Sequence, residues 1–175
     1  MSSALKSLDE PPRSESVPTF DEIYQAYLGY VARLGYEFLS RPDLVDDFVQ
    51  DVFLDVYRGL SRLKDAGALK AWIRQIAVRR ALRQLKRRRL VRMLGLDKAR
   101  ADTLSQSADQ EWVTLLGEVN DALKGCSAEE RVVFVLRKVQ GEKLEDIAEL
   151  LGCGLTTVKR RLFAAQRRIQ GRVEQ

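Results

Sequence analysis

Residues 144–162 read LEDIAELLGCGLTTVKRRL, in which two short apolar stripes are separated by a glycine. Ala148 is small where two crossing helices would approach closely, and Gly152 permits a tight turn between them. The apolar positions at which the two helices would pack are Ile147, Leu151, Val158 and Leu162. This pattern predicts a helix-turn-helix.

Polar and basic side chains fall on the outer face of the second predicted helix. They are Thr156, Thr157, Lys159, Arg160 and Arg161. In the usual docking of a helix-turn-helix, the start of this helix meets base edges in the major groove, and nearby cations hold phosphates. The pattern therefore indicates DNA binding, with a plain helical hairpin that ends in a solvated basic segment as the alternative.

Three further amphipathic helices are expected upstream. Apolar residues recur at three- and four-residue steps over residues 20–34, 45–60 and 69–85, which is the period of a helix that buries one face. Pro42 ends the first of these helices, because proline disfavours helical geometry at the residue before it. No strand-like alternation competes, so the sequence predicts an all-α fold.

Composition divides the 175 residues into four segments. Residues 1–18 are rich in serine, proline and charge and are expected to form a disordered leader. Residues 19–92 form a first small helical domain, and the small and polar residues 93–110 form a flexible linker. Residues 111–175 form a second helical domain, in which SAEE at 127–130 has the capping-box pattern of a helix start.

The basic residues cluster, although 30 Lys and Arg against 25 Asp and Glu leave a net charge of only +5. Ten cations and no acid lie between residues 66 and 96: Lys70, Arg74, Arg79, Arg80, Arg83, Lys86, Arg87, Arg88, Arg89 and Arg92. Like charges one turn apart repel each other on an isolated helix. A negative partner, above all a phosphate backbone, would remove that penalty and make binding sensitive to salt. A solvated charged face is the alternative.

Trp72 lies within the same basic helix. An aromatic ring beside cations can stack on an unpaired base. A tryptophan on an apolar stripe is nevertheless more often part of a core, so both interpretations stay open.

An acidic group precedes the basic stretch and comprises Asp46, Asp47, Asp51 and Asp55. It suits a protein-docking face or a solvated surface better than a metal site, because its members are spread around a regular helix. Histidine is absent, and no nucleophile, base and orienting group can be assembled, which disfavours an enzyme. We expect neither a metal nor a cofactor.

The two cysteines, Cys126 and Cys153, are far apart and have no histidine near them, so neither a disulfide framework nor a zinc spacing is visible. We expect buried or half-buried thiols. No apolar run approaches the roughly 20 residues of a membrane span, and the first residues lack the apolar stretch of a signal peptide. A cytoplasmic protein without stable membrane insertion is therefore expected.

Three segments, in order, resemble landmarks of sigma-70-type factors of the extracytoplasmic-function (ECF) group. They are DDFVQDVFL at 46–54, AWIRQIA at 71–77, and EERVVF at 129–134 followed by the helix-turn-helix. The likeness spans about residues 20–168, and three motifs in the right order are far more specific than any one of them. The turn here reads CGLTT, whereas the family often has a proline followed by Gly-Thr at this place. The sequence therefore defines the first residue of the second helix only to within about one position.

The resemblance implies a sigma factor that binds core RNA polymerase and directs promoter-specific transcription initiation. The first domain would be sigma region 2, which binds the beta-prime clamp and opens the minus-ten element. The second would be sigma region 4, which binds the minus-thirty-five element and the beta flap, and residues 93–110 would be the linker threaded through the polymerase. An anti-sigma factor is a further partner that the resemblance implies.

The resemblance also assigns roles to individual residues. The positions that face the clamp are matched by Asp47, Gln50 and Asp51. Residues 61–70 match a loop that captures a flipped base of the minus-ten element. A pocket and nearby cations can offset the free-energy cost of unstacking that base. The minus-ten candidates are Lys64, Lys70, Trp72, Arg74, Arg79, Arg80, Arg83, Lys86 and Arg87. The minus-thirty-five candidates are Arg131, Thr156, Thr157, Lys159, Arg160 and Arg161.

Two other functions use the same features. A stand-alone helix-turn-helix regulator would bind its operator tightly without polymerase, usually as a two-fold dimer. A polyanion-binding adaptor would show salt-sensitive binding without preference for any base sequence.

Overall fold

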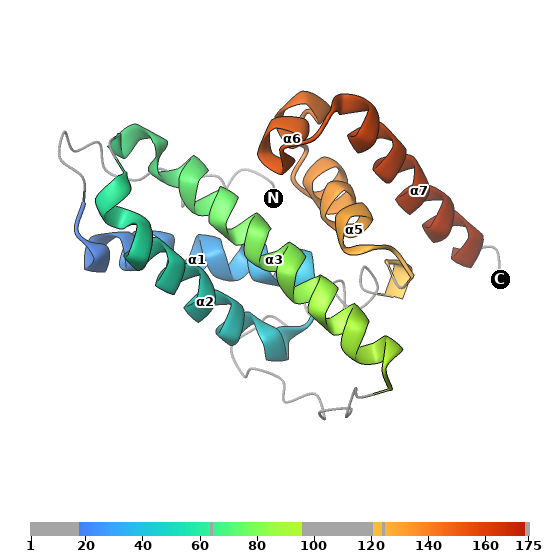
Figure 1. Cartoon of the computed structure of the whole chain (residues 1–175), viewed down its shortest axis with the longest axis horizontal. Helices are drawn as coiled ribbons and strands as arrows, with labels where there is room; N and C mark the ends of the chain where they lie inside the picture. The colour runs from blue at the N-terminus through green and yellow to red at the C-terminus, as the bar shows by residue number, and fades with distance from the viewer. Residues whose placement is uncertain (1–17, 64, 96–120, 124, 174–175) are drawn as a thin grey trace, which may run out of the picture.

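The computed structural model describes residues 18–63, 65–95, 121–123 and 125–173. Every regular element within these ranges is a helix, which confirms the all-α expectation (Figure 1). The leader up to residue 17, Lys64, most of the linker and residues 111–120 lie outside the described ranges, so the predictions made for them stay predictions.

The first domain contains three α-helices: α1 (Phe20–Leu39), α2 (Val45–Gly59) and α3 (Leu69–Met93). Three short 3₁₀ turns connect them: η1 (Pro42–Leu44), η2 (Leu60–Arg62) and η3 (Ala66–Ala68). These bounds agree with the apolar periodicity. The buried side chains of all three helices form one core, which includes Phe38, Phe48 and Ile73.

Helix α1 begins and ends with specific caps. The Thr19 hydroxyl accepts a hydrogen bond from the Glu22 backbone, and the Glu22 carboxylate accepts one from the Thr19 N–H at 2.8 Å. The capping-box pattern is also present in the sequence, as TFDE at residues 19–22, although no helix start was predicted from it. The helix ends at Ser40, which has a left-handed φ of 47° just before Pro42.

Trp72 packs against the end of α2. A Cβ atom added at Gly59 would lie 2.7 Å from Cζ2 of the Trp72 ring, so only glycine allows this close approach. The ring is half-buried against the core. Trp72 therefore packs as part of the core, and base stacking by its ring stays a prediction.

The acids of α2 pair with cations of α3. The Arg80 guanidinium donates from Nε and Nη2 to the two carboxylate oxygens of Asp55, each at 2.5 Å, and lies 3.2 Å from Asp51. Arg83 lies 3.4 Å from Asp55. Part of the repulsion expected along the basic helix is thus offset within the domain. The hydrogen bonds from Arg80 hold the pKa of Asp55 below its usual value, against the opposing effect of burial.

The second domain contains α5 (Ala128–Phe134), the π-helical turn η4 (Val135–Val139), α6 (Leu144–Leu151) and α7 (Leu155–Val173). The predicted capping box is confirmed, because the Ser127 N–H donates to Glu130 Oε2 at 2.7 Å and the Glu130 N–H donates to Ser127 Oγ at 3.1 Å. The apolar residues Val132, Val133, Leu136 and Val139 have the spacing of one uninterrupted helix, and the π-helical turn departs from that expectation.

Helices α6 and α7 form the predicted helix-turn-helix. Gly152 adopts a left-handed φ of 60°, and the Cys153 N–H donates to the Ala148 carbonyl at 3.0 Å. Ile147 and Val158 are fully buried between the helices. Helix α7 begins at Leu155, which settles the position that the CGLTT turn left open.

The two domains pack against each other, and the hydrophobic core continues from one into the other. We name this contact the seam: α1 and α3 on one side, with α5, η4 and residues 140–142 on the other. In Figure 1 the second domain lies along α3. The sequence indicated two tethered domains and carried no signal for this closed arrangement.

The Asp55–Arg80 pair gives a testable stability prediction. We expect a double-mutant cycle with Asp55→Asn and Arg80→Gln to show a coupling of about 1 kcal/mol at pH 7, measured by urea unfolding. Because the pKa of Asp55 is lowered in the fold, its contribution is present above the unfolded pKa and is lost as pH falls through the folded value. A coupling that stays constant down to pH 2 would contradict this account.

Candidate nucleic-acid interface

The first turns of α7 present the polar and basic face that a recognition helix needs. Thr156, Lys159 and Arg160 are exposed, and Thr157 and Arg161 are half-buried. The Arg161 Nη1 donates to Cys153 Sγ at 3.6 Å, which fixes this side chain against the turn. The outer end of the helix-turn-helix is thus open to solvent at the positions that the sequence indicated.

The basic helix α3 exposes only part of its cationic set. Arg79, Arg83, Lys86 and Arg87 are exposed, whereas Lys70, Trp72, Arg74 and Arg80 are half-buried. Lys70 lies over the ring of Tyr30, with its Nζ 5.4 Å from the ring centroid. Arg80 is turned toward the acids of α2, so the minus-ten candidates do not all face one open surface.

Arg74 is engaged by the second domain. Its Nη2 lies 2.8 Å from Glu142 Oε1 and donates to Gln140 Oε1 at 2.9 Å. The Gln140 amide in turn donates from Nε2 to Glu37 Oε2 on α1 at 2.7 Å. A cation expected to meet DNA is therefore held across the seam by an acid and an amide.

Lys86 makes a second ionic contact across the seam, because its Nζ lies 2.7 Å from Glu129 Oε1. Burial raises the pKa of the Glu129 carboxyl, but its hydrogen bonds, led by the one from Lys86, outweigh burial and leave the pKa below its usual value. The lowered pKa thus favours the anionic form of Glu129 beside Lys86, a cation for which DNA contact is a prediction.

Arg131, a minus-thirty-five candidate, does not lie at an open surface in this structure. It is only 7% exposed and lies inside the seam, so its contact with DNA stays a prediction that requires the seam to open. Its Nε donates to the Phe38 carbonyl at 2.7 Å and its Nη2 to the Leu39 carbonyl at 2.9 Å. These carbonyls end α1, where they lack partners within the helix and carry partial negative charge. Burial lowers the pKa of Arg131 to about 10, so it stays cationic at neutral pH.

The candidate polymerase-facing residues lie on the exposed side of α2. Asp47, Gln50 and Asp51 are all exposed, and Asp51 also lies 3.2 Å from Arg80.

Within the described ranges, no three acids or thiols gather as metal ligands would. Cys126 and Cys153 are half-buried and form no disulfide within the described part of the chain. Among the helices that the structure describes, none has the length and apolar character to cross a membrane.

Sequence reasoning missed four residues of the seam. They are Glu37, Glu129, Gln140 and Glu142. Glu129 stands out in the sequence only as part of the SAEE and EERVVF motifs, and Gln140 directly follows the π-helical turn, which the periodicity does not predict. Their partners are set by how the domains pack, so no local pattern could have identified them.

Comparison with known families assigns both domains. The model of sigma-70 region 2 matches residues 23–91, and the model of sigma-70 region 4 matches residues 117–169. The ECF RNA polymerase sigma-E factor of Haemophilus influenzae is 29% identical over 174 residues, which cover 89% of this chain and 87% of that protein. The RNA polymerase sigma factor SigV of Bacillus subtilis is 26% identical over 133 residues, which cover 76% and 78%.

A solved structure has the same fold. It is the sigma factor RpoE of Bartonella quintana, crystallised in complex with the anti-sigma factor NepR. The two chains share 24% sequence identity and superpose with a TM-score of 0.63, over 89% of this chain and 96% of that one. The likeness covers both domains and therefore supports the architecture described above.

The buried position of Arg131 leads to a stability prediction. Arg131→Met removes both donors from the end of α1, and we expect a loss of about 2 kcal/mol in the free energy of unfolding at neutral pH, measured with urea. Lys138→Met is the matched control, because Lys138 is exposed on the neighbouring turn. An equal, small effect of both substitutions would show that the buried guanidinium does not hold the domains together.

Proposed function

The chain belongs to the ECF group of the sigma-70 family, and we propose that the exposed faces of α2, α3 and α7 are the surfaces through which it acts. A sigma factor binds core RNA polymerase and directs promoter-specific transcription initiation, and members of this family are not enzymes. The observation that carries the proposal is that both sigma regions are present in order, each on a domain with an open charged face.

Helix α7 is proposed to read the minus-thirty-five element. Its first turns offer hydroxyl groups from Thr156 and Thr157 and cations from Lys159 and Arg160. Such groups hydrogen-bond base edges and phosphates in the major groove. Arg161 lies beside them against the turn, whereas Arg131 is buried in the seam and could reach DNA only after the domains separate.

Helix α3 and the preceding loop are proposed to bind the minus-ten element. The exposed cations Arg79, Arg83 and Arg87 are accessible in the closed arrangement. Arg74 and Lys86 first have to exchange Glu142 and Glu129 for phosphates. We therefore propose that the domains separate when the chain binds polymerase and promoter, because the same cations cannot serve both partners at once.

The exposed side of α2 is proposed to bind the polymerase clamp through Asp47, Gln50 and Asp51. We also propose that an anti-sigma factor holds this chain inactive, on the precedent of RpoE from Bartonella quintana. The site of action would be the cytoplasm, where RNA polymerase is found. No observation favours a stand-alone regulator, since region 2 would then have no role.

In vitro transcription with core polymerase tests the function and the recognition helix together. We expect promoter-dependent transcripts only when the chain is present.

Arg160→Ala should cost about 1 to 3 kcal/mol in promoter binding and relax the preference at one minus-thirty-five position. Arg167→Ala, further along α7, is the control that should leave the preference intact. Uniform weakening across all promoters would reduce Arg160 to a phosphate contact.

Charge reversal on α2 tests the docking face. Asp47→Lys should reduce association with core polymerase by at least tenfold, measured by fluorescence anisotropy, because it places a cation where an anion is expected to meet the clamp. Asp146→Lys is the matched control, since it makes the same change at an exposed position in the first turn of α6. Unchanged association of the Asp47 variant would refute this assignment.

A further inference from the structure

Three cations that are DNA-binding candidates of the two domains are held together within the seam. Arg74 and Lys86 belong to the proposed minus-ten surface on α3, and Arg131 belongs to the minus-thirty-five candidates of the second domain. Their partners lie on the opposite domain in each case, and are Glu142, Glu129 and the C-terminal end of α1, respectively. The seam therefore occupies part of both DNA surfaces at the same time.

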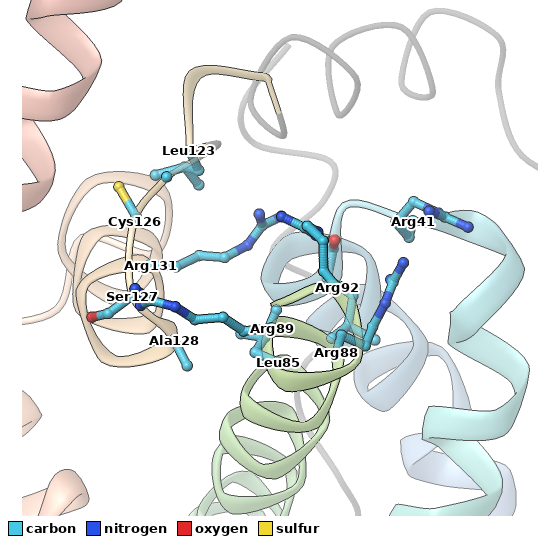
Figure 2. A pocket seen from close by; sticks show the side chains of 12 residues that line it. Arg41, Leu85, Arg88, Arg89, Arg92, Leu123, Cys126, Ser127, Ala128 and Arg131 are labelled. Atoms are coloured by element: carbon cyan, nitrogen blue, oxygen red, sulfur yellow. The ribbon is translucent and has the colours of Figure 1, made fainter. Parts of the chain in front are cut away.

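The partners of these cations offer what a phosphate would offer. Glu142 and Glu129 place carboxylate oxygens 2.8 and 2.7 Å from the nitrogen atoms of their cations. In Figure 2 the Arg131 side chain extends from α5 toward the other domain, where it donates to the Phe38 and Leu39 carbonyls. These carbonyls carry the partial negative charge of a helix end. Because phosphate oxygens accept the same charge-assisted hydrogen bonds, DNA and the closed seam compete for the same donors.

Arg74 is paired less completely than Arg80, another cation of α3. Arg80 donates from Nε and Nη2 to Asp55 of its own domain, so opening the seam leaves this bidentate pair intact. Arg74 contacts both Glu142 and Gln140 through Nη2, and its buried Nε has no hydrogen-bond partner within the described part of the chain. A phosphate can accept from two nitrogens of one guanidinium. Exchange of the partner would therefore satisfy a donor that the closed seam leaves unpaired.

We propose that the seam is an autoinhibitory contact that couples the two DNA surfaces. While it is closed, carboxylates and carbonyls of the chain occupy Arg74, Lys86 and Arg131, and DNA meets only cations outside the seam. One separation of the domains breaks all of these contacts, so the three cations are released together. This inference rests on the proposed function and adds regulation to it, because the free chain is withheld from DNA until a partner separates the domains.

The shared seam makes the two promoter elements cooperative. DNA bound to α3 stabilises the open form, which exposes Arg131. DNA bound through Arg131 in turn leaves Arg74 and Lys86 open to phosphate. By thermodynamic linkage the two effects are equal in free energy. Each element would therefore strengthen the binding of the other, although no residue has to contact both.

Neutralising the two acids of the seam tests the inhibition. The full chain, without polymerase, is titrated into a short fluorescein-labelled DNA duplex of arbitrary sequence, and binding is followed by fluorescence anisotropy. Glu129→Gln combined with Glu142→Gln should bind about fivefold more tightly than the unchanged chain, because the loss of two ion pairs shifts the balance toward the open form by about that factor. The dependence on salt should also become steeper, because more cations meet phosphates.

Asp21→Asn combined with Asp46→Asn is the matched control. It removes the same number of negative charges from exposed positions in the first turns of α1 and α2, away from the contacts of the seam. DNA binding by the control should tighten by less than about twofold, since salt screens distant charges. An equal gain from both pairs of substitutions would overturn the proposal, because net charge alone would then explain it. Far-UV circular dichroism confirms that each variant is folded.

Arg131→Met supplies a second test, because its expected effect changes sign with the state of the seam. In the unchanged chain it weakens the seam, and the release of Arg74 and Lys86 outweighs the loss of one DNA contact, so binding should tighten. In the variant with Glu129→Gln and Glu142→Gln, Arg131 is already available to DNA, and the same substitution should weaken binding. A loss in both backgrounds, or a gain in both, would overturn the coupling of the two surfaces.

Amide hydrogen exchange of the free chain separates failure of the inhibition from failure of the proposed function. The variant with Glu129→Gln and Glu142→Gln should exchange faster in residues 128–139, on the second-domain side of the seam. Unchanged exchange and unchanged DNA binding would overturn the inhibition and leave promoter-dependent transcription with polymerase intact. Faster exchange without tighter DNA binding would overturn both the inhibition and the proposed role of α3, because the released cations would then not bind DNA.

Discussion

The closed arrangement depends on one buried guanidinium. The last carbonyls of any α-helix have no partner within that helix, and those of Phe38 and Leu39 lie where the second domain covers them. Arg131 supplies the donors, and its charge suits the negative end of the helix dipole. Without it, closing the seam would bury polar groups with no partner, a cost comparable to that of a lost hydrogen bond.

The ion pairs across the seam join acids of the second domain to cations of α3. Glu142 and Glu129 pair with Arg74 and Lys86, two cations on the helix proposed to bind the minus-ten element. Protein carboxylates therefore occupy places suited to phosphates. If a phosphate replaces each carboxylate, both cations stay paired when the seam opens. Because phosphate binding depends on salt, the balance between the closed and the DNA-bound forms becomes sensitive to salt concentration.

Local patterns were sufficient for the elements but not for their arrangement. Periodicity, the SAEE capping box and Gly152 predicted the helices and the helix-turn-helix because those signals act within a few residues. The exposed face of α7 followed from the same periodicity. The inward position of Arg131 depends on hydrogen bonds to residues about 90 positions away, and an arginine in a sequence looks the same in a seam as on a DNA surface.

The most direct test is the distance between the two domains in solution. Spin labels at the exposed positions Gln25 on α1 and Gln170 on α7, in a chain whose two cysteines are replaced by serine, report it by pulsed electron paramagnetic resonance. We expect one narrow distribution for the free chain and a different, longer one in complex with core polymerase and promoter. Indistinguishable distributions in the two states, or a broad one in the free chain, would contradict it.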